Sequence, residues 1–278
     1  MKLYDAHNHF HFEPLAAHRA AIDAELRAIG LCAAVVNGTC EEEWPVVAAL
    51  PDTYPWVRPS FGLHPWDCGN RSPRWLEKLR ASLLATPSAA VGEIGLDRFI
   101  LGLKPDDPRI CGARVAPLGE QCEACAAQLA LAAELERPAA IHCVQAHGAL
   151  LALLKSTPLP RRGFLLHGYR GSAEMMKSYA DLGAYFSWNL EGLAPRAEAM
   201  REVFRLIPAD RLLVETDAPT KAPPPDLNRL PLGDAPDGTP INHPANIRVA
   251  YETLAKLRGD PLESLAARVE QNFRRLFS

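Results

Sequence analysis

The segment Tyr4-Asp5-Ala6-His7-Asn8-His9 stands near the start of the chain, directly after a short apolar stretch. Side chains of a strand alternate between its two faces, so His7 and His9 point to the same face. Their imidazole rings can therefore reach one metal ion together. A partly exposed histidine pair at the end of a strand is the alternative explanation of this segment taken alone, because short motifs also occur by chance.

Four further segments place a histidine or a carboxylate directly after an apolar run, at Glu93, His142, His167 and Glu215-Thr216-Asp217. Each run has about the length of a buried parallel strand, and each is followed by glycine, proline or another residue that ends regular structure. A charged side chain at the end of a buried strand needs a partner or a metal ion. Five strands that end in this way indicate one constellation, made of His7, His9, Glu93, His142, His167 and Asp217.

Strand-like and helical patterns alternate along the whole sequence. Strands are predicted at residues 2–6, 32–36, 56–61, from 91, 139–142, 164–166, 184–188 and 212–215. Helices are predicted at residues 14–29, 42–50, 72–85, 118–136, 146–155, 172–182 and 195–207, with two more between 244 and 277. Serines are expected to cap the helices that begin at Ser72 and Ser172. Eight strands alternating with helices over about 250 residues are typical of an α/β fold, the (β/α)8 TIM barrel.

A doubly wound open sheet is the structural alternative. It does not bring the ends of strands one, four, five, six and eight to one point, whereas all strands of a closed barrel end at the same rim. We expect residues 1–278 to form a single barrel domain, because the sequence shows no internal repeat and no Gly/Ser-rich linker. Residues 99–117 and 218–240 are long irregular loops of the kind that often act as lids, and both follow strands at the active-site face of this fold.

Composition limits the possible partners. The chain has 278 residues and a net charge of −3, which disfavours tight binding of long duplex DNA but not an enzyme that grips a strand end through metal ions. Seven cysteines at irregular spacing, without a secretory signal, favour a reduced, cytoplasmic compartment. Cys122 and Cys125 form a lone CxxC in a helical pattern, more typical of incidental helix cysteines than of a zinc or redox site. No stretch approaches the roughly 18 apolar residues of a membrane span.

Imidazole and carboxylate ligands together suit zinc, manganese or magnesium. Six ligands exceed what one catalytic ion with an open position needs, and they fit two divalent metal ions. Glu93 could bridge both ions through its two oxygens, and Asp217 could hold one ion and take a proton from a water that the two ions activate. The sequence contains no P-loop, no dinucleotide-binding fingerprint and no G-x-S-x-G motif.

Several motifs resemble those of the TatD family of metal-dependent deoxyribonucleases and occur in that family's order: Asp5-Ala6-His7-Asn8-His9, Gly62-Leu63-His64-Pro65, Gly92-Glu93-Ile94-Gly95-Leu96-Asp97, Ile141-His142, His167-Gly168-Tyr169-Arg170-Gly171 and Glu215-Thr216-Asp217-Ala218-Pro219. Residues 242–247 and 271–277 are similar to the family's closing helices. The resemblance covers nearly the whole chain. It implies a TIM-barrel phosphodiesterase of the amidohydrolase-like superfamily, with metal-ligand roles for the six residues above.

The sequence departs from the family's pattern at the substrate rim. Val144 stands where the family usually has arginine, and Arg170 could supply a phosphate contact from the neighbouring strand. His64 is expected either near the substrate, as in the family, or packed beside Pro65. Glu215 is expected to orient a metal ligand, with a salt bridge inside the barrel as its alternative.

The favoured function is a TatD-like deoxyribonuclease or phosphodiesterase that acts on nucleic acid ends or small phosphodiesters. An amidohydrolase or lactonase using the same metal site is the second hypothesis. Superfamily members of that kind often carry a metal-bridging lysine at the fourth strand, where this chain has Glu93. A non-catalytic barrel that serves as a binding partner is the third, and retention of all six ligand-type residues speaks against it. The sequence indicates no protein partner.

Overall fold

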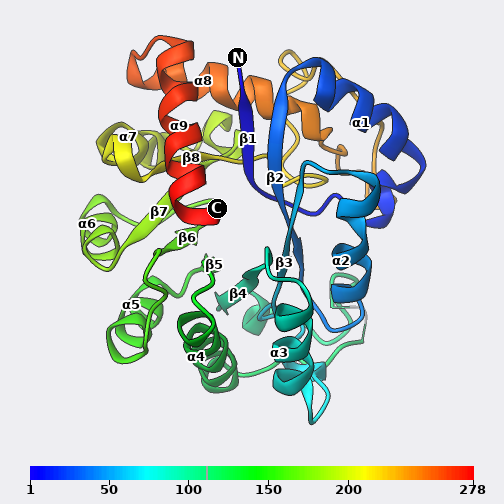
Figure 1. Ribbon diagram of the computed structural model, residues 1–278, viewed down its shortest axis with the longest axis vertical. Coiled ribbons are helices and arrows are strands. Elements are labelled where there is room, and N and C mark those ends of the chain that lie inside the picture. Colours follow the sequence, from blue (N-terminus) through cyan, green and yellow to red (C-terminus); the bar gives the residue numbers. More distant parts are fainter. Residues whose placement is uncertain (111) are drawn as a thin grey trace.

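The computed structural model describes residues 1–110 and 112–278. Within these residues, eight parallel strands pair in sequence order into one sheet, and helices surround it (Figure 1). The strands are β1 (Leu3–Asn8), β2 (Leu31–Gly38), β3 (Val57–Phe61), β4 (Ala90–Asp97), β5 (Ala139–Val144), β6 (Phe164–Leu166), β7 (Ala184–Trp188) and β8 (Leu212–Val214). The helices are α1 (Arg19–Ala28), α2 (Trp44–Thr53), α3 (Trp75–Ala85), α4 (Leu118–Glu134), α5 (His147–Ser156), α6 (Ala173–Asp181), α7 (Glu198–Leu206), α8 (Ile247–Arg258) and α9 (Leu262–Phe277). The predicted TIM barrel is confirmed.

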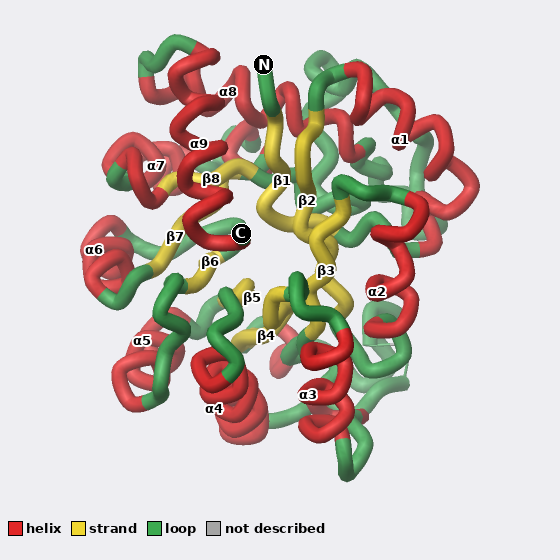
Figure 2. The backbone as a smooth tube through the Cα atoms, viewed as in Figure 1, coloured by secondary structure: helices red, strands yellow, loops and turns green. Residues whose placement is uncertain are grey.

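The barrel closes between its last and first strands. The Asp217 N–H donates to the His7 carbonyl oxygen at 3.0 Å, and the His9 N–H donates to the Ala218 carbonyl oxygen at 2.7 Å. Both bonds lie at the carboxyl ends of the strands, so closure places Asp217 beside the two histidines. Figure 2 shows the strands as an inner ring within the ring of helices.

The predicted starts of three helices can be compared with the structure. Ser72 does not cap α3, which begins at Trp75, because its hydroxyl and its N–H both donate to the Glu41 carboxylate, at 2.6 and 2.7 Å. Ser172 does cap α6, since its hydroxyl oxygen accepts from the Met175 N–H. The helix predicted at residues 14–29 starts as a 3-10 turn at Glu13–His18 before α1 begins.

Both long loops are held against the barrel. In the first loop, the Arg114 guanidinium pairs with Glu120, and the Arg114 N–H donates to Asn70. Three leucines of the second loop pack against the hydrophobic core, at positions 227, 230 and 232.

Cys122 and Cys125 both lie in α4 as free cysteines, while Cys111 lies outside the described residues. Across the described part of the chain, no helix combines the length and apolar character that a membrane span requires.

Helix α9 fixes the start of the last strand. In Figure 1 it crosses β8 and brings the C-terminus to the middle of the view. Buried Asn272 donates through its amide to the carbonyl oxygens of Ala209 and Leu212, both at 2.9 Å. These two bonds anchor β8, whose far end carries the turn with Asp217.

We predict that Asn272→Leu lowers the free energy of unfolding by about 1–3 kcal/mol, because two buried carbonyl oxygens lose their donor. Urea denaturation of the variant and the parent protein measures this difference. Gln271→Ala, one position away on the exposed side of α9, is the control and should stay close to the parent. Equal stability of Asn272→Leu and the parent would show that the anchor contributes little.

Candidate metal centre

Glu93 lies in β4 between two glycines that allow β5 to approach closely. A Cβ atom on Gly92 would lie 2.7 Å from the Ala140 Cβ, and one on Gly95 would lie 2.0 Å from the His142 carbonyl oxygen. Gly95 also has a φ of +142°, which disfavours residues with side chains. The Gly-Glu-Ile-Gly sequence therefore brings Glu93 against the histidine-bearing strand.

Glu93 is 3% exposed, and its carboxylate lies among five histidine rings. Its Oε2 is 3.3 Å from the Nε2 atoms of both His7 and His9. Its Oε1 faces the other three rings, at 2.9 Å from His167 Nε2, 3.0 Å from His142 Nδ1 and 3.3 Å from His64 Nε2. Each oxygen thus faces its own group of nitrogen atoms, which is the arrangement expected of a carboxylate that bridges two cations.

Electrostatics in this cluster follow from its burial. Burial by itself raises the pKa of Glu93, but the histidines, His167 and His64 foremost, outweigh it and hold the pKa well below its usual value. Burial lowers the pKa of His167, and the carboxylates of Glu93 and Glu215 reverse this and raise it well above the ordinary value. The site is therefore built to keep a buried negative charge beside positive charge.

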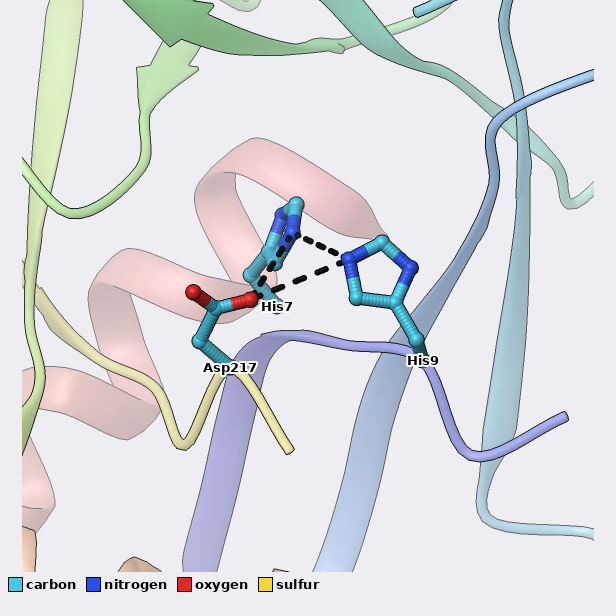
Figure 3. Close-up of side chains that lie close together, drawn as sticks. All are labelled: His7, His9 and Asp217. Carbon is cyan, nitrogen blue, oxygen red and sulfur yellow. Dashed lines mark hydrogen bonds and ion pairs between the residues drawn. The ribbon is translucent and has the colours of Figure 1, made fainter. Parts of the chain in front are cut away.

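Asp217 joins the group on the His7 side (Figure 3). Its Oδ1 lies 3.8 Å from His7 Nε2 and 3.7 Å from His9 Nε2, and the two nitrogen atoms are 3.3 Å apart. Asp217 has a φ of +52°, in the left-handed region that residues other than glycine rarely adopt. Such backbone strain is often found at functional sites, and here it accompanies a carboxylate that faces both histidines.

Neighbouring polar groups orient the histidine rings. His9 Nδ1 lies 2.8 Å from the backbone carbonyl oxygen of Asn37, which places a proton on Nδ1 and directs Nε2 towards Glu93 and Asp217. His167 Nδ1 lies 3.6 Å from Glu215 Oε1. Glu215 is fully buried and accepts hydrogen bonds from Ser187 and Asn189. Glu215 therefore lies behind a histidine and faces away from solvent.

Sequence reasoning assigned no role to two other carboxylates. Asp97 Oδ2 lies 3.1 Å from His142 Nε2 and accepts a 2.7 Å hydrogen bond from the Trp66 indole N–H. Asp97 follows Glu93 by four positions on the same strand, so the period of two that paired His7 with His9 could have identified it.

Asp5 is the second carboxylate without a predicted role. Its Oδ1 accepts from the backbone N–H groups of His7 and Thr216, at 3.1 and 3.0 Å. Its Oδ2 accepts from the Thr216 hydroxyl at 2.6 Å and from the Asn8 amide at 3.0 Å. Burial raises the pKa of Asp5 to about 7, although these four hydrogen bonds oppose the rise. Asp5 thus ties the histidine-bearing strand to the turn that carries Asp217.

Two pockets open beside the cluster. The smaller has a volume of about 70 Å³ and is lined by residues that include Arg170, Glu191 and Lys221. The larger, of about 350 Å³, is lined by residues that include Phe12, Trp66 and Lys221. His142, His167 and Asp217 line both. Thr220 and Lys221 come from the loop at 218–240, whereas none of the described residues of the loop at 99–117 lines either pocket.

The substrate-rim residues lie at different depths. His64 belongs to the buried cluster around Glu93, and its ring centroid is 4.5 Å from that of His142. The Arg170 side chain is 58% exposed and pairs with Glu191 at 3.3 Å. Val144 lines the smaller pocket near Arg170. His64 is therefore closer to the candidate metal ligands than the sequence indicated.

A family model and the sequences of known proteins place similar proteins in the same family. The family model described as TatD related DNase matches residues 4–278. The chain is 31% identical to an uncharacterized metal-dependent hydrolase, YjjV, of Escherichia coli, over all of this chain and 98% of that protein. It is 32% identical to a 3′-5′ ssDNA/RNA exonuclease TatD of Klebsiella pneumoniae, over 91% of this chain and 89% of that protein.

Solved structures agree with the sequence comparison. The crystal structure of the TatD homologue YjjV from Escherichia coli superposes with a TM-score of 0.84 at 30% identity, covering 99% of this chain and 97% of that one. A TatD-family hydrolase from Entamoeba histolytica superposes with a TM-score of 0.78 at 17% identity, over all of this chain and 98% of that one, and shares the fold.

We predict that Asp5→Asn lowers the free energy of unfolding by about 1–3 kcal/mol, because an NH₂ group replaces an oxygen that accepts buried hydrogen bonds. Urea denaturation measures the loss. Asp52→Asn, an exposed carboxylate change, controls for the altered charge. Should both variants unfold at the same urea concentration as the parent, Asp5 does not hold the two segments together.

Proposed function

This chain belongs to the TatD-related DNase family, and we propose that it is a metal-dependent phosphodiesterase that acts on nucleic acid ends or small phosphodiesters. The observation that carries the proposal is the position of Glu93, whose two oxygens face separate groups of histidine nitrogens beside two pockets. The exonuclease named among the relatives supports a substrate with a free strand end. We take residues 1–278 as one catalytic unit.

The donor set fits two divalent ions of zinc, manganese or magnesium. We assign one ion to His7, His9, Asp217 and Glu93, and the other to His142, His167 and Glu93. When bound, such ions would activate a water and stabilise the charge that develops on phosphate oxygens.

A buried atom without a hydrogen-bond partner supports the assignment. Asn37 Oδ1 lies in the same amide whose nitrogen is 3.1 Å from His7 Nδ1. Turning the amide over brings Oδ1 to accept a proton from His7 Nδ1, in exchange for the 3.4 Å hydrogen bond that the amide nitrogen donates to the Val35 carbonyl oxygen. That arrangement satisfies the oxygen and leaves His7 Nε2 unprotonated, as a metal ligand requires.

Other roles in the proposed reaction fall to side chains around the ions. Asp217 is placed to accept the proton of the attacking water, since its carboxylate lies beside the histidines and faces both pockets. Glu215 and Asp97 hold the rings of His167 and His142. His64, whose side chain is 12% exposed and lines the larger pocket, is placed to contact the substrate there. Arg170 is placed to contact a phosphate group from the smaller pocket.

A substrate panel tests the proposal. Single-stranded DNA, duplex DNA, RNA, bis-p-nitrophenyl phosphate and simple amides are incubated with the protein and added Mg²⁺, Mn²⁺ or Zn²⁺. We expect hydrolysis of strand ends or of the small phosphodiester. Strong amidase activity without phosphodiesterase activity would contradict the proposal and favour the amidohydrolase alternative.

We predict that Glu93→Ala and Asp217→Ala each abolish hydrolysis while the fold is retained. Loss of a positioned general base commonly costs about 10²–10⁴ in rate, and loss of a carboxylate shared by both ions should cost more. Initial rates and circular dichroism measure activity and folding. Glu174→Ala, an exposed carboxylate in α6, is the control. Near-normal activity of Asp217→Ala with metal bound would exclude its assigned role.

We predict that Arg170→Ala raises KM for phosphodiesters about 10-fold and leaves the metal content unchanged, because a charged donor to the phosphate is lost. Arg161→Ala, at a largely exposed arginine before β6 that lines neither pocket, is the control. Few phosphate contacts also predict a shallow dependence of nucleic acid binding on salt. Tight, steeply salt-dependent binding of long duplex DNA would contradict this account of the substrate.

A further inference from the structure

Lys221 is a cation beside the candidate metal centre to which the sequence analysis gave no role. It lies four residues after Asp217 and lines both pockets. We propose that Lys221 binds a phosphate group of the substrate in the smaller pocket, with Arg170 as the second cation. The proposal rests on the proposed function, since it names the part of the substrate that this site recognises.

Lys221 and Arg170 share a single carboxylate partner, Glu191. Lys221 Nζ lies 3.0 Å from Glu191 Oε1, and Arg170 Nη1 lies 3.3 Å from the same oxygen atom. Neither cation has another ion pair among the described residues. Two positive groups thus share one carboxylate oxygen, and these three side chains carry one net positive charge. Asp217, the other carboxylate that lines the smaller pocket, is assigned to a metal ion. A phosphate oxygen in the smaller pocket would supply the missing negative charge.

Glu191 holds this group in place relative to the metal centre. Its backbone N–H donates to Asn189 Oδ1 at 3.1 Å, and the Asn189 amide donates to Glu215 Oε1 at 2.9 Å. Glu215 in turn lies beside the ring of His167. A continuous chain of contacts therefore connects the two cations to a candidate metal ligand, so a phosphate held by Lys221 would lie at a fixed position beside the ions.

The backbone and the burial of Lys221 also favour a binding role. Its φ is +58°, in the left-handed region that a lysine rarely adopts. Its side chain is 34% exposed. Burial lowers the pKa of the ammonium group, but the negative charges of Asp217 and Glu191 outweigh this effect and raise the pKa. Lys221 therefore stays charged in a partly buried position, where hydrogen bonds to an anion are strong.

The two pockets differ in the part of a substrate that they suit. The smaller, at about 70 Å³, offers Arg170 and Lys221 to a compact anion. The larger, at about 350 Å³, is lined by residues that include Phe12 and Trp66. Aromatic rings stack on nucleobases. We therefore expect the phosphate in the smaller pocket and the nucleoside in the larger, with Lys221 at the boundary.

Three variants test the role of Lys221: Lys221→Met removes the charge, Lys221→Arg keeps it, and Lys177→Met removes an exposed lysine of α6 as a control. Calorimetry measures the affinity of the metal-loaded protein for inorganic phosphate. Initial rates give KM and kcat for bis-p-nitrophenyl phosphate. Metal content and thermal midpoint are recorded for each variant.

We expect Lys221→Met to weaken phosphate binding and to raise KM by about 10-fold each, with kcat, metal content and thermal midpoint little changed. Lys221→Arg should recover most of the affinity. If the protein binds phosphate through Lys221 but cleaves no phosphodiester, the proposed function fails and the role of Lys221 stands. If phosphate does not bind, or if Lys221→Met matches Lys177→Met in both measurements, the proposal is wrong.

Discussion

The buried carboxylate of Glu93 organises the carboxyl end of this barrel. Five histidine rings converge on its two oxygens at distances between 2.9 and 3.3 Å. A carboxylate out of contact with water is costly unless opposite charge compensates it. Without metal ions, protonated histidines compensate the negative charge of Glu93. Divalent ions bound between the same groups would compensate it more fully. The same constraint explains Gly92 and Gly95, since a side chain at either position would push β4 away from β5.

Much of this site follows from local sequence patterns. An apolar run that ends in histidine or a carboxylate identifies both the strand and the end that reaches the candidate site, which is why the positions of His142, His167 and Asp217 could be predicted. Barrel closure then brings these ends to one rim. The ring of His64, by contrast, reaches Glu93 from the segment after β3. Its direction depends on tertiary packing that no local pattern specifies.

Contacts between distant residues account for what the sequence did not predict. Ser72 bonds to Glu41 instead of capping a helix, because a carboxylate from another segment lies within reach. Lys221 and Arg170 meet at Glu191 although the three residues come from loops after different strands. The shared carboxylate makes these cations part of one group. Such pairs depend on the arrangement of the barrel rim, whereas the period of two and the apolar runs are properties of single strands.

The distribution of charge fits an enzyme that holds a small part of a nucleic acid. The net charge is −3; Arg170 lines the smaller pocket, Lys221 lines both, and the aromatic residues Phe12 and Trp66 line the larger. Metal ions and a few cations would then provide most of the attraction for a phosphate group. Such a site suits a strand end or a small phosphodiester better than a long duplex, whose binding needs an extended basic surface.

The most direct test of the central claim is a crystal structure of the protein purified without chelator and loaded with Mn²⁺ or Zn²⁺, with the ions located by anomalous scattering. The account predicts two ions, one on each side of Glu93, with one carboxylate oxygen directed at each. A single ion, or ions bound away from Glu93, would contradict it.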